Sequence, residues 1–200
     1  MNSEKIKDIA KRLKRGEIGV IPSDTLVYGL TGQALNRSTI ENIYKLKGRR
    51  PDKPFIIVIS KLSDLVRFGV KIDKAISPFL KKFWPGPVSI ILSITERTYQ
   101  KKLAYLHRQT RTLAFRLPKN KFWQELIKKT GPLVSTSANP EKLPPAQTIS
   151  EAREYFGEKI KLYFSAGRRL NNPSSTLIKI KNNKVEILRQ GRAKIKLWKQ

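Results

Sequence analysis

The sequence contains no cysteine, a single histidine and few acidic residues, and each shortage excludes a class of chemistry. Without cysteine there is no disulfide framework, no thiolate nucleophile and no zinc site built on cysteine. A histidine-rich metal site is excluded too, and a Ser-His-Asp triad has one candidate base, His107. Because His107 stands beside Arg108 in a polar connection, we expect it on the surface.

Long apolar runs are also missing. The longest unbroken aliphatic and aromatic stretch is Phe55–Ile59, and the first fifteen residues carry eight charged side chains. A membrane-spanning helix needs about 18 or more apolar residues, and a signal peptide needs an apolar centre. The sequence therefore predicts a cytoplasmic protein without membrane association.

What the chain has in excess is positive charge. Lys and Arg number 42 against 15 Asp and Glu, a net charge of +27, and Glu186 is the single acid from Lys159 onward. Such a surplus attracts polyanions through phosphate contacts. The bias of a lysine-rich proteome is the alternative explanation, but it does not explain the scarcity of carboxylates. We therefore predict binding to tRNA or another structured RNA.

Helical periodicity alternates with apolar strand patterns along the whole chain. Helices are expected around Ile6–Leu13, Ile40–Tyr44, Leu62–Val66, Ile72–Phe83 and Phe122–Ile127, and one more ends at Phe156. Ser38 or Thr39 is expected to cap the second helix, and Thr148 or Ser150 the last. Strands are expected over Glu17–Ile21, Phe55–Ile59, Val88–Ile94, Thr112–Leu117, Leu133–Val134, Lys161–Ser165, Ser175–Ile180 and Lys184–Leu188. The pattern predicts one α/β domain over residues 1–200, a twisted mixed sheet flanked by helices.

Neither of the two familiar phosphate-binding signatures occurs, so a nucleotide would have to be held by cations and small-residue turns. The densest cationic turn is Lys47–Pro54, between a helix end and a buried strand. Cations at a helix C-terminus also complement the helix dipole, so a solvated helix end is the alternative interpretation. Pro51 and Pro54 favour a binding turn, because they stiffen it.

Two hydroxyl-rich turns and one arginine complete the candidates. Pro22–Leu30 and Ser135–Asn139 each follow an apolar strand, and each is either a binding turn or a plain tight turn. Arg116 lies on the apolar run Leu113–Phe115, where an arginine needs an anionic partner or a cleft. The Trp84–Pro87 turn is expected to be structural.

In this order the motifs resemble the YrdC-like threonylcarbamoyl-AMP synthase family, over about residues 4–192. The matching pieces are Pro-Ser-Asp-Thr and Tyr-Gly-Leu in 22–30, the Lys47–Pro54 turn, Trp84–Pro87, Thr-x-x-x-Arg-x-Pro at 112–118, Ser135–Asn139, Ser174–Thr176 and Ile187–Arg189. The chain departs from the family in having both Leu26 and Val27 before Tyr28. It also has Val58 where some relatives have a histidine, and Glu141-Lys142 where Ser-Gly is usual.

The resemblance implies a nucleotidyltransferase that makes threonylcarbamoyl-AMP and pyrophosphate from L-threonine, bicarbonate and ATP. Mg2+ would arrive with ATP, and no metal ligand from a protein side chain is expected. A downstream threonylcarbamoyl-transferase complex would use the product to modify tRNA. The implied fold is a YrdC-like sheet with a concave basic face.

Residue roles also follow from the resemblance. The implied catalytic residues are Lys47 and Arg49, and the implied threonine contacts are Thr25, Arg116, Ser137 and Ser175. The implied ATP contacts are Lys47, Arg49, Arg50, Lys53, Thr112, Ser135, Asn139 and Arg189, with Arg49 and Arg50 as alternatives for the phosphates. Neither Lys47 nor Arg116 is expected to fill the core, so alanine at either should cost activity far more than stability.

Two other functions fit parts of the sequence. A non-catalytic RNA-binding module would explain the charge, and a carbamoyl-transfer domain of the kind used in hydrogenase maturation would explain the motifs. That domain normally sits in a larger chain with zinc-finger cysteines, which are absent here. Threonine-dependent release of pyrophosphate separates the synthase from the RNA-binding module.

Overall fold

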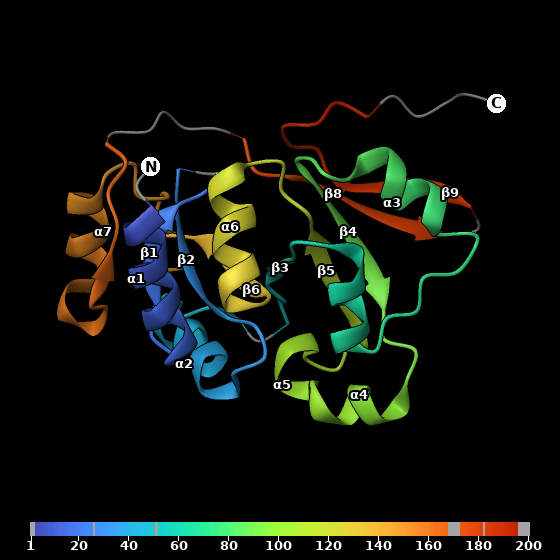
Figure 1. Cartoon of the computed structure of the whole chain (residues 1–200), viewed down its shortest axis with the longest axis horizontal. Helices are drawn as coiled ribbons and strands as arrows, with labels where there is room; N and C mark the ends of the chain where they lie inside the picture. The colour runs from blue at the N-terminus through green and yellow to red at the C-terminus, as the bar shows by residue number, and fades with distance from the viewer. Residues whose placement is uncertain (1–2, 26, 51, 168–172, 182, 196–200) are drawn as a thin grey trace.

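The computed structural model describes residues 3–25, 27–50, 52–167, 173–181 and 183–195. In this part of the chain, nine strands form one twisted sheet in the order β7-β1-β2-β6-β3-β5-β4-β8-β9 (Figure 1). They are β1 (Gly19–Pro22), β2 (Tyr28–Gln33), β3 (Ile56–Val58), β4 (Val88–Ser93), β5 (Thr112–Arg116), β6 (Leu133–Ser137), β7 (Leu162–Tyr163), β8 (Thr176–Lys181) and β9 (Lys184–Arg189). The pairs β1–β7, β3–β5 and β4–β8 are parallel, and the other neighbours are antiparallel. The expected mixed α/β fold is confirmed.

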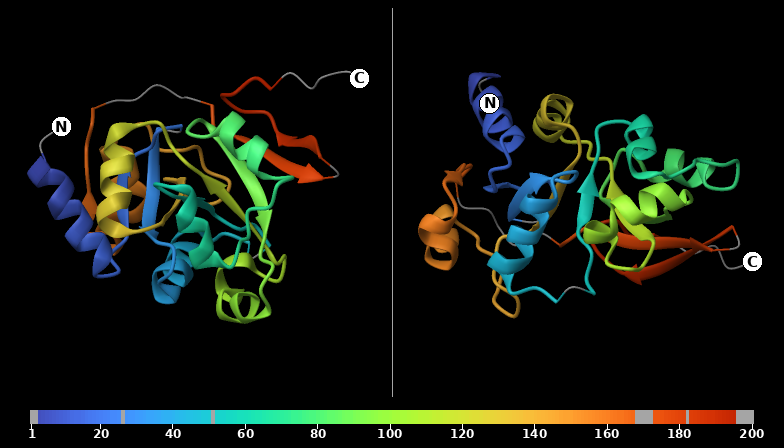
Figure 2. Two further views of the ribbon diagram at one scale, coloured as in Figure 1. Left: turned by 45° about the vertical axis from the view of Figure 1, so that its right-hand side comes forward. Right: turned by 90° about the horizontal axis from the view of Figure 1, so that it is seen from below.

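Helices cover both faces of the sheet. They are α1 (Ser3–Lys14), α2 (Arg37–Lys47), the 3-10 helix η1 (Leu62–Phe68), α3 (Ser77–Phe83), α4 (Arg97–Lys102), α5 (Ala104–His107), α6 (Lys121–Thr130), α7 (Ile149–Phe156) and the 3-10 turn η2 (Gly157–Lys159). Successive strand residues point to opposite faces, and Val20 and Ile21 accordingly belong to different clusters. Ile21 packs with residues of α1 and α6, whereas Val20 packs with residues of α7. Figures 1 and 2 show where these three helices lie.

The third and largest cluster fills the other half of the sheet. It joins α2, η1, α3 and α5 to β3, β4, β5 and β8. Phe68 meets Phe115 edge-on there, with ring centroids 5.2 Å apart. This hydrophobic cluster holds β5 in place, and β5 is the strand that ends at Arg116.

Several elements differ from the sequence-based expectations. Helix α2 is capped by Asn36, whose Oδ1 accepts from the Thr39 backbone N–H at 3.0 Å, and not by Ser38 or Thr39. Helix α3 starts at Ser77 rather than Ile72, because Pro78 suits the first turn of a helix. The cap Thr148 of α7 is confirmed.

His107 is buried, not exposed as expected. The connection before β5 folds into α4 and α5, which the sequence did not reveal, and these helices turn His107 inward. Its Nε2 lies 2.7 Å from the Gln100 carbonyl oxygen, and the Arg111 backbone N–H donates to Nδ1 at 3.4 Å. The histidine therefore holds this connection together.

Two further differences concern strands. β2 was not expected at all, yet it pairs with β1 on one side and β6 on the other. β6 continues to Ser137, three residues beyond the expected Leu133–Val134. The first half of Ser135–Asn139 is therefore strand.

Candidate active site

A cavity of about 400 Å3 collects residues from distant parts of the chain. Its lining comprises Thr25, Arg49, Lys53, Pro54, Phe55, Ile56, Ala114, Arg116, Ser135, Thr136, Ser137, Pro145, Ser174, Ser175, Leu177 and Arg189. Four of these side chains are cationic, and no carboxylate stands among the lining residues that the structure describes. A larger hollow of about 960 Å3 lies at α4 and α5, apart from these motifs. The smaller cavity is therefore the candidate active site.

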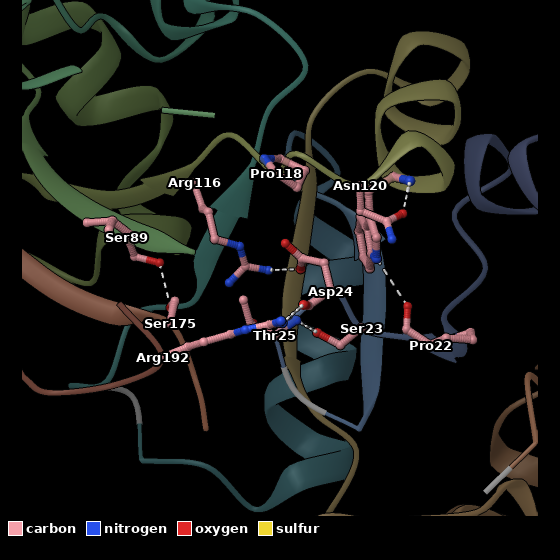
Figure 3. Close-up of polar contacts among 12 residues, drawn as sticks. Pro22, Ser23, Asp24, Thr25, Ser89, Arg116, Pro118, Asn120, Ser175 and Arg192 are labelled. Carbon is pink, nitrogen blue, oxygen red and sulfur yellow. Dashed lines mark hydrogen bonds and ion pairs between the residues drawn. The ribbon is translucent and has the colours of Figure 1, made fainter. Parts of the chain in front are cut away.

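Arg116, the last residue of β5, forms a buried ion pair with Asp24. Its Nη2 donates to Asp24 Oδ1 at 2.6 Å, and the two side chains are 3% and 8% exposed (Figure 3). The Asp24 backbone oxygen also accepts from Arg192 Nη1 at 3.3 Å. Arg116 thus has the anionic partner that its apolar surroundings require, and it also lines a cavity.

Two polar atoms beside this ion pair lack a partner. Within the described part of the chain, the Thr25 hydroxyl and Arg116 Nε are buried and make no hydrogen bond. The Thr25 backbone N–H, by contrast, donates to Ser23 Oγ at 3.3 Å. Buried polar groups in proteins are nearly always hydrogen-bonded, so an unsatisfied pair on a cavity wall is suited to a ligand.

Ser175 and Arg189 form another part of the cavity wall. Arg189 donates through Nη2 to the Ser175 backbone oxygen at 2.9 Å, and the Ser175 and Ser89 hydroxyls lie 2.8 Å apart (Figure 3 for the serines). Burial lowers the pKa of Arg189, and the charges of Arg116 and Arg49 lower it further. Three arginines therefore face one space, which favours an anionic ligand.

The turn after α2 supplies the other cations. Gly48 ends the helix with φ of 58°, the left-handed region that glycine tolerates. Arg49 then folds back, and its Nε donates to the Lys53 backbone oxygen at 2.9 Å. Arg50 points away and pairs with Asp52 at 3.7 Å in solvent. Of the two alternatives left open for the phosphates, Arg49 is the one that lines the cavity.

Lys47 is not among the lining residues, but it ties the end of α2 to the segment around Ser137, which does line the cavity. Only 3% exposed, its Nζ donates to the backbone oxygens of Ser137 and Asn139 at 2.6 and 2.5 Å. Asn139 Oδ1 accepts a third bond at 3.3 Å. Burial lowers the pKa of Lys47 to about 7, and Arg49 acts in the same direction. The expectation that Lys47 does not fill the core is wrong, and the same holds for Arg116, which is 2% exposed.

The cavity thus brings together eight of the twelve implied residues. Those that line it are Thr25, Arg49, Lys53, Arg116, Ser135, Ser137, Ser175 and Arg189. Lys47 and Asn139 bond to each other outside the lining, Arg50 faces solvent, and Thr112 lies at the other end of β5. Leu26 and Pro51, on which two of the sequence arguments rest, lie outside the described residues.

Two carboxylates at this site were not assigned a role from the sequence. Asp24 holds Arg116, and Glu141 Oε1 accepts from Lys53 Nζ at 2.7 Å. Hydrogen bonds from Lys53 and from the Arg50 backbone lower the pKa of Glu141. The available signal was their position: Asp24 lies within Pro-Ser-Asp-Thr, and Glu141 comes two residues after Ser135–Asn139.

Comparison with known proteins identifies the family. The family model that covers Sua5, YciO and YrdC proteins, described as "Telomere recombination", matches residues 11–191. This chain belongs to that family. A putative threonylcarbamoyl-AMP synthase of Mycobacterium tuberculosis H37Rv is 26% identical over 179 residues, which are 90% of this chain and 80% of that protein.

Solved structures agree with this assignment. Sua5 of P. abyssi, crystallised with L-threonine, superposes with a TM-score of 0.81 at 26% identity. The likeness covers 96% of this chain and 55% of that one, so this chain spans about half of that protein. Full-length HypF, bound to phosphate and nucleotide, has a TM-score of 0.79 at 21% identity over 94% of this chain and 29% of that one. At that identity the likeness to HypF concerns the fold alone.

Among the helices of the described chain, none combines the length and the hydrophobicity needed to cross a bilayer.

Proposed function

We propose that this member of the family is an L-threonylcarbamoyladenylate synthase, which makes threonylcarbamoyl-AMP from L-threonine, bicarbonate and ATP. The names of its relatives support this activity. The structural observation that carries it is the pair of buried, unsatisfied groups on the cavity wall, the Thr25 hydroxyl and Arg116 Nε. A small amino acid with a carboxylate and a hydroxyl offers a partner to each, and L-threonine is such a ligand.

The reaction needs charge compensation more than a nucleophile from the protein. The threonine amine attacks the carbon of bicarbonate, and loss of water leaves a carbamate. An oxygen of that carbamate then attacks the α-phosphorus of ATP, the bond to the β-phosphate breaks, and pyrophosphate leaves. Bicarbonate, the carboxylate of threonine and the triphosphate of ATP would repel one another in one cavity, and Arg49, Lys53, Arg116 and Arg189 offset that charge. An enzyme with this reaction would be a nucleotidyltransferase.

Mg2+ is proposed to arrive with ATP, where it neutralises charge on the phosphates. Among the described residues, no group of three or more His, Cys, Asp or Glu side chains could hold a metal ion. The two carboxylates near the cavity, Asp24 and Glu141, already pair with Arg116 and Lys53. The phosphates of ATP are therefore the better ligands for the ion.

The proposed product is a reactive mixed anhydride, and its consumer would be a threonylcarbamoyl-transferase complex acting on tRNA. The net charge of +27 supports a direct contact of this chain with RNA. A cytoplasmic location is proposed with it, since a chain without cysteine suits a reducing compartment.

One assay tests the proposal. Purified protein with Mg2+, ATP, L-threonine and bicarbonate should release pyrophosphate and form threonylcarbamoyl-AMP, detected by mass spectrometry. Omission of threonine or of bicarbonate should abolish both products. Release of orthophosphate and ADP without threonine would reject the proposal, and pyrophosphate release that depends on carbamoyl phosphate would favour the carbamoyl-transfer alternative.

A further inference from the structure

Glu141 reaches from the segment after β6 onto the cationic turn that follows α2. Its Oε1 accepts from Lys53 Nζ at 2.7 Å, and its Oε2 accepts from the Arg50 backbone N–H at 2.9 Å. Its own backbone N–H donates to the Lys47 oxygen at 2.6 Å, which fixes where the side chain starts. The carboxylate therefore bridges Arg50 and Lys53 of this turn.

These donors are the kind that bind a phosphate. A lysine ammonium and a backbone N–H that converge on one anion are what cationic turns offer to phosphate oxygens. Lys53 also lines the cavity, so an anion bound there comes within reach of the same ammonium. A carboxylate and a phosphate at contact distance repel each other, and one lysine cannot satisfy both well.

We infer that Glu141 is a positioning residue that occupies the place of a phosphate oxygen on Lys53 and the Arg50 N–H, and that the triphosphate of ATP displaces it. The inference takes ATP as the ligand from the proposed function. The carboxylate holds Lys53 and the Arg50 backbone N–H in place until the triphosphate replaces it. During binding, the ligand must compete with it, so a highly charged triphosphate succeeds where an uncharged nucleoside gains nothing from the turn.

The test compares two variants that remove one negative charge each. Glu141→Gln keeps the size of the side chain, and Glu158→Gln is the matched control, because Glu158 forms an exposed pair with Lys161 away from the cavity. The dissociation constants of ATP, inorganic triphosphate and adenosine are measured by calorimetry without threonine. Glu141→Gln should bind ATP and triphosphate about fivefold more tightly at low salt. It should bind adenosine unchanged, and the control should match the wild type.

Each other outcome has a defined meaning. If Glu141 only tethers the two segments, Glu141→Gln will bind ATP more weakly, and that result overturns the inference. Equal gains in both glutamine variants would also overturn it, since they would reflect net charge alone. In a Lys53→Gln background the gain from Glu141→Gln should become smaller, because only the Arg50 N–H is then left to compete for, and an undiminished gain would contradict competition for Lys53.

The inference and the proposed function can fail separately. Binding of ATP in the absence of threonine does not require the synthase reaction. Tighter binding of ATP by Glu141→Gln, together with no threonine-dependent pyrophosphate release by the wild type, would keep the inference and reject the function.

Discussion

Replacing Arg116 by methionine should cost the fold about 3–5 kcal/mol, because it leaves Asp24 as a buried charge without its partner. The magnitude follows from the geometry: the two side chains are 3% and 8% exposed and their charged atoms are 2.6 Å apart. Asp24→Asn should cost less, since the amide oxygen can still accept from Arg116. With both charges removed, the double variant should be at least about 2 kcal/mol more stable than additivity predicts.

Urea unfolding of the wild type, the two single variants and the double variant measures these differences in the free energy of unfolding. The midpoints are compared at a constant m-value. A loss below about 0.5 kcal/mol in Arg116→Met would refute the buried-pair argument. The double variant should also be folded but inactive in threonine-dependent pyrophosphate release, because it lacks the arginine that faces the cavity. Arg116→Lys should restore part of the stability but not the activity, since an ammonium lacks the planar fork of a guanidinium.

Two further predictions use titration and salt. Lys47 has a pKa of about 7 in the folded protein and about 10.5 unfolded. Between pH 7 and 10.5 the unfolded chain therefore holds more proton on Lys47 than the folded chain does. As a result, the free energy of unfolding should rise as the pH goes from 7 to 10. Lys47→Met should flatten that rise while the exposed control Lys45→Met should not. For RNA, log–log plots of affinity against salt should be steep, and glutamine at Lys194, Lys196 and Lys199 should lower the slope by about 0.7–0.9 per lysine without changing pyrophosphate release.

The middle of the sheet was predictable because β3, β4 and β5 are largely apolar runs. The runs at β3, β4 and β5 were recognised within one or two residues. β2 was missed because Gly29 and Gly32 break its apolar pattern. The need for glycine at these positions comes from other elements that pack against the strand. A Cβ on Gly32 would approach Thr39 Cγ2 of α2 to 2.4 Å, which shows that the helix packs directly on this strand. Such a requirement comes from tertiary packing and leaves no local periodicity.

The site was predictable where a residue conflicted with its surroundings. Arg116 stands on an apolar run, and this conflict indicated a partner or a cleft, both of which the structure has. Lys47 carried no such signal, because a lysine in the last turn of a helix is usually solvated. Its buried contacts with Ser137 and Asn139 depend on a strand 90 residues further along the chain. Contacts between residues so far apart in the chain are set by the topology of the fold and leave no signal in the local sequence.

Thr112 offers a last test of how the ligand lies in the site. It does not line the cavity, but side chains on one strand alternate, so Thr112 shares a face of β5 with Ala114 and Arg116. At about 3.3 Å per residue, Thr112 lies about 13 Å from Arg116 along that face. If threonine sits at Arg116, a nucleotide extending over Ala114 would reach Thr112, as the resemblance implies. Thr112→Val should then weaken ATP binding about fivefold, the value of one neutral hydrogen bond, and leave threonine binding unchanged. The exposed hydroxyl of Ser38 provides the control through Ser38→Ala, and an unaltered ATP affinity in Thr112→Val would place the nucleotide nearer to Ser135 instead.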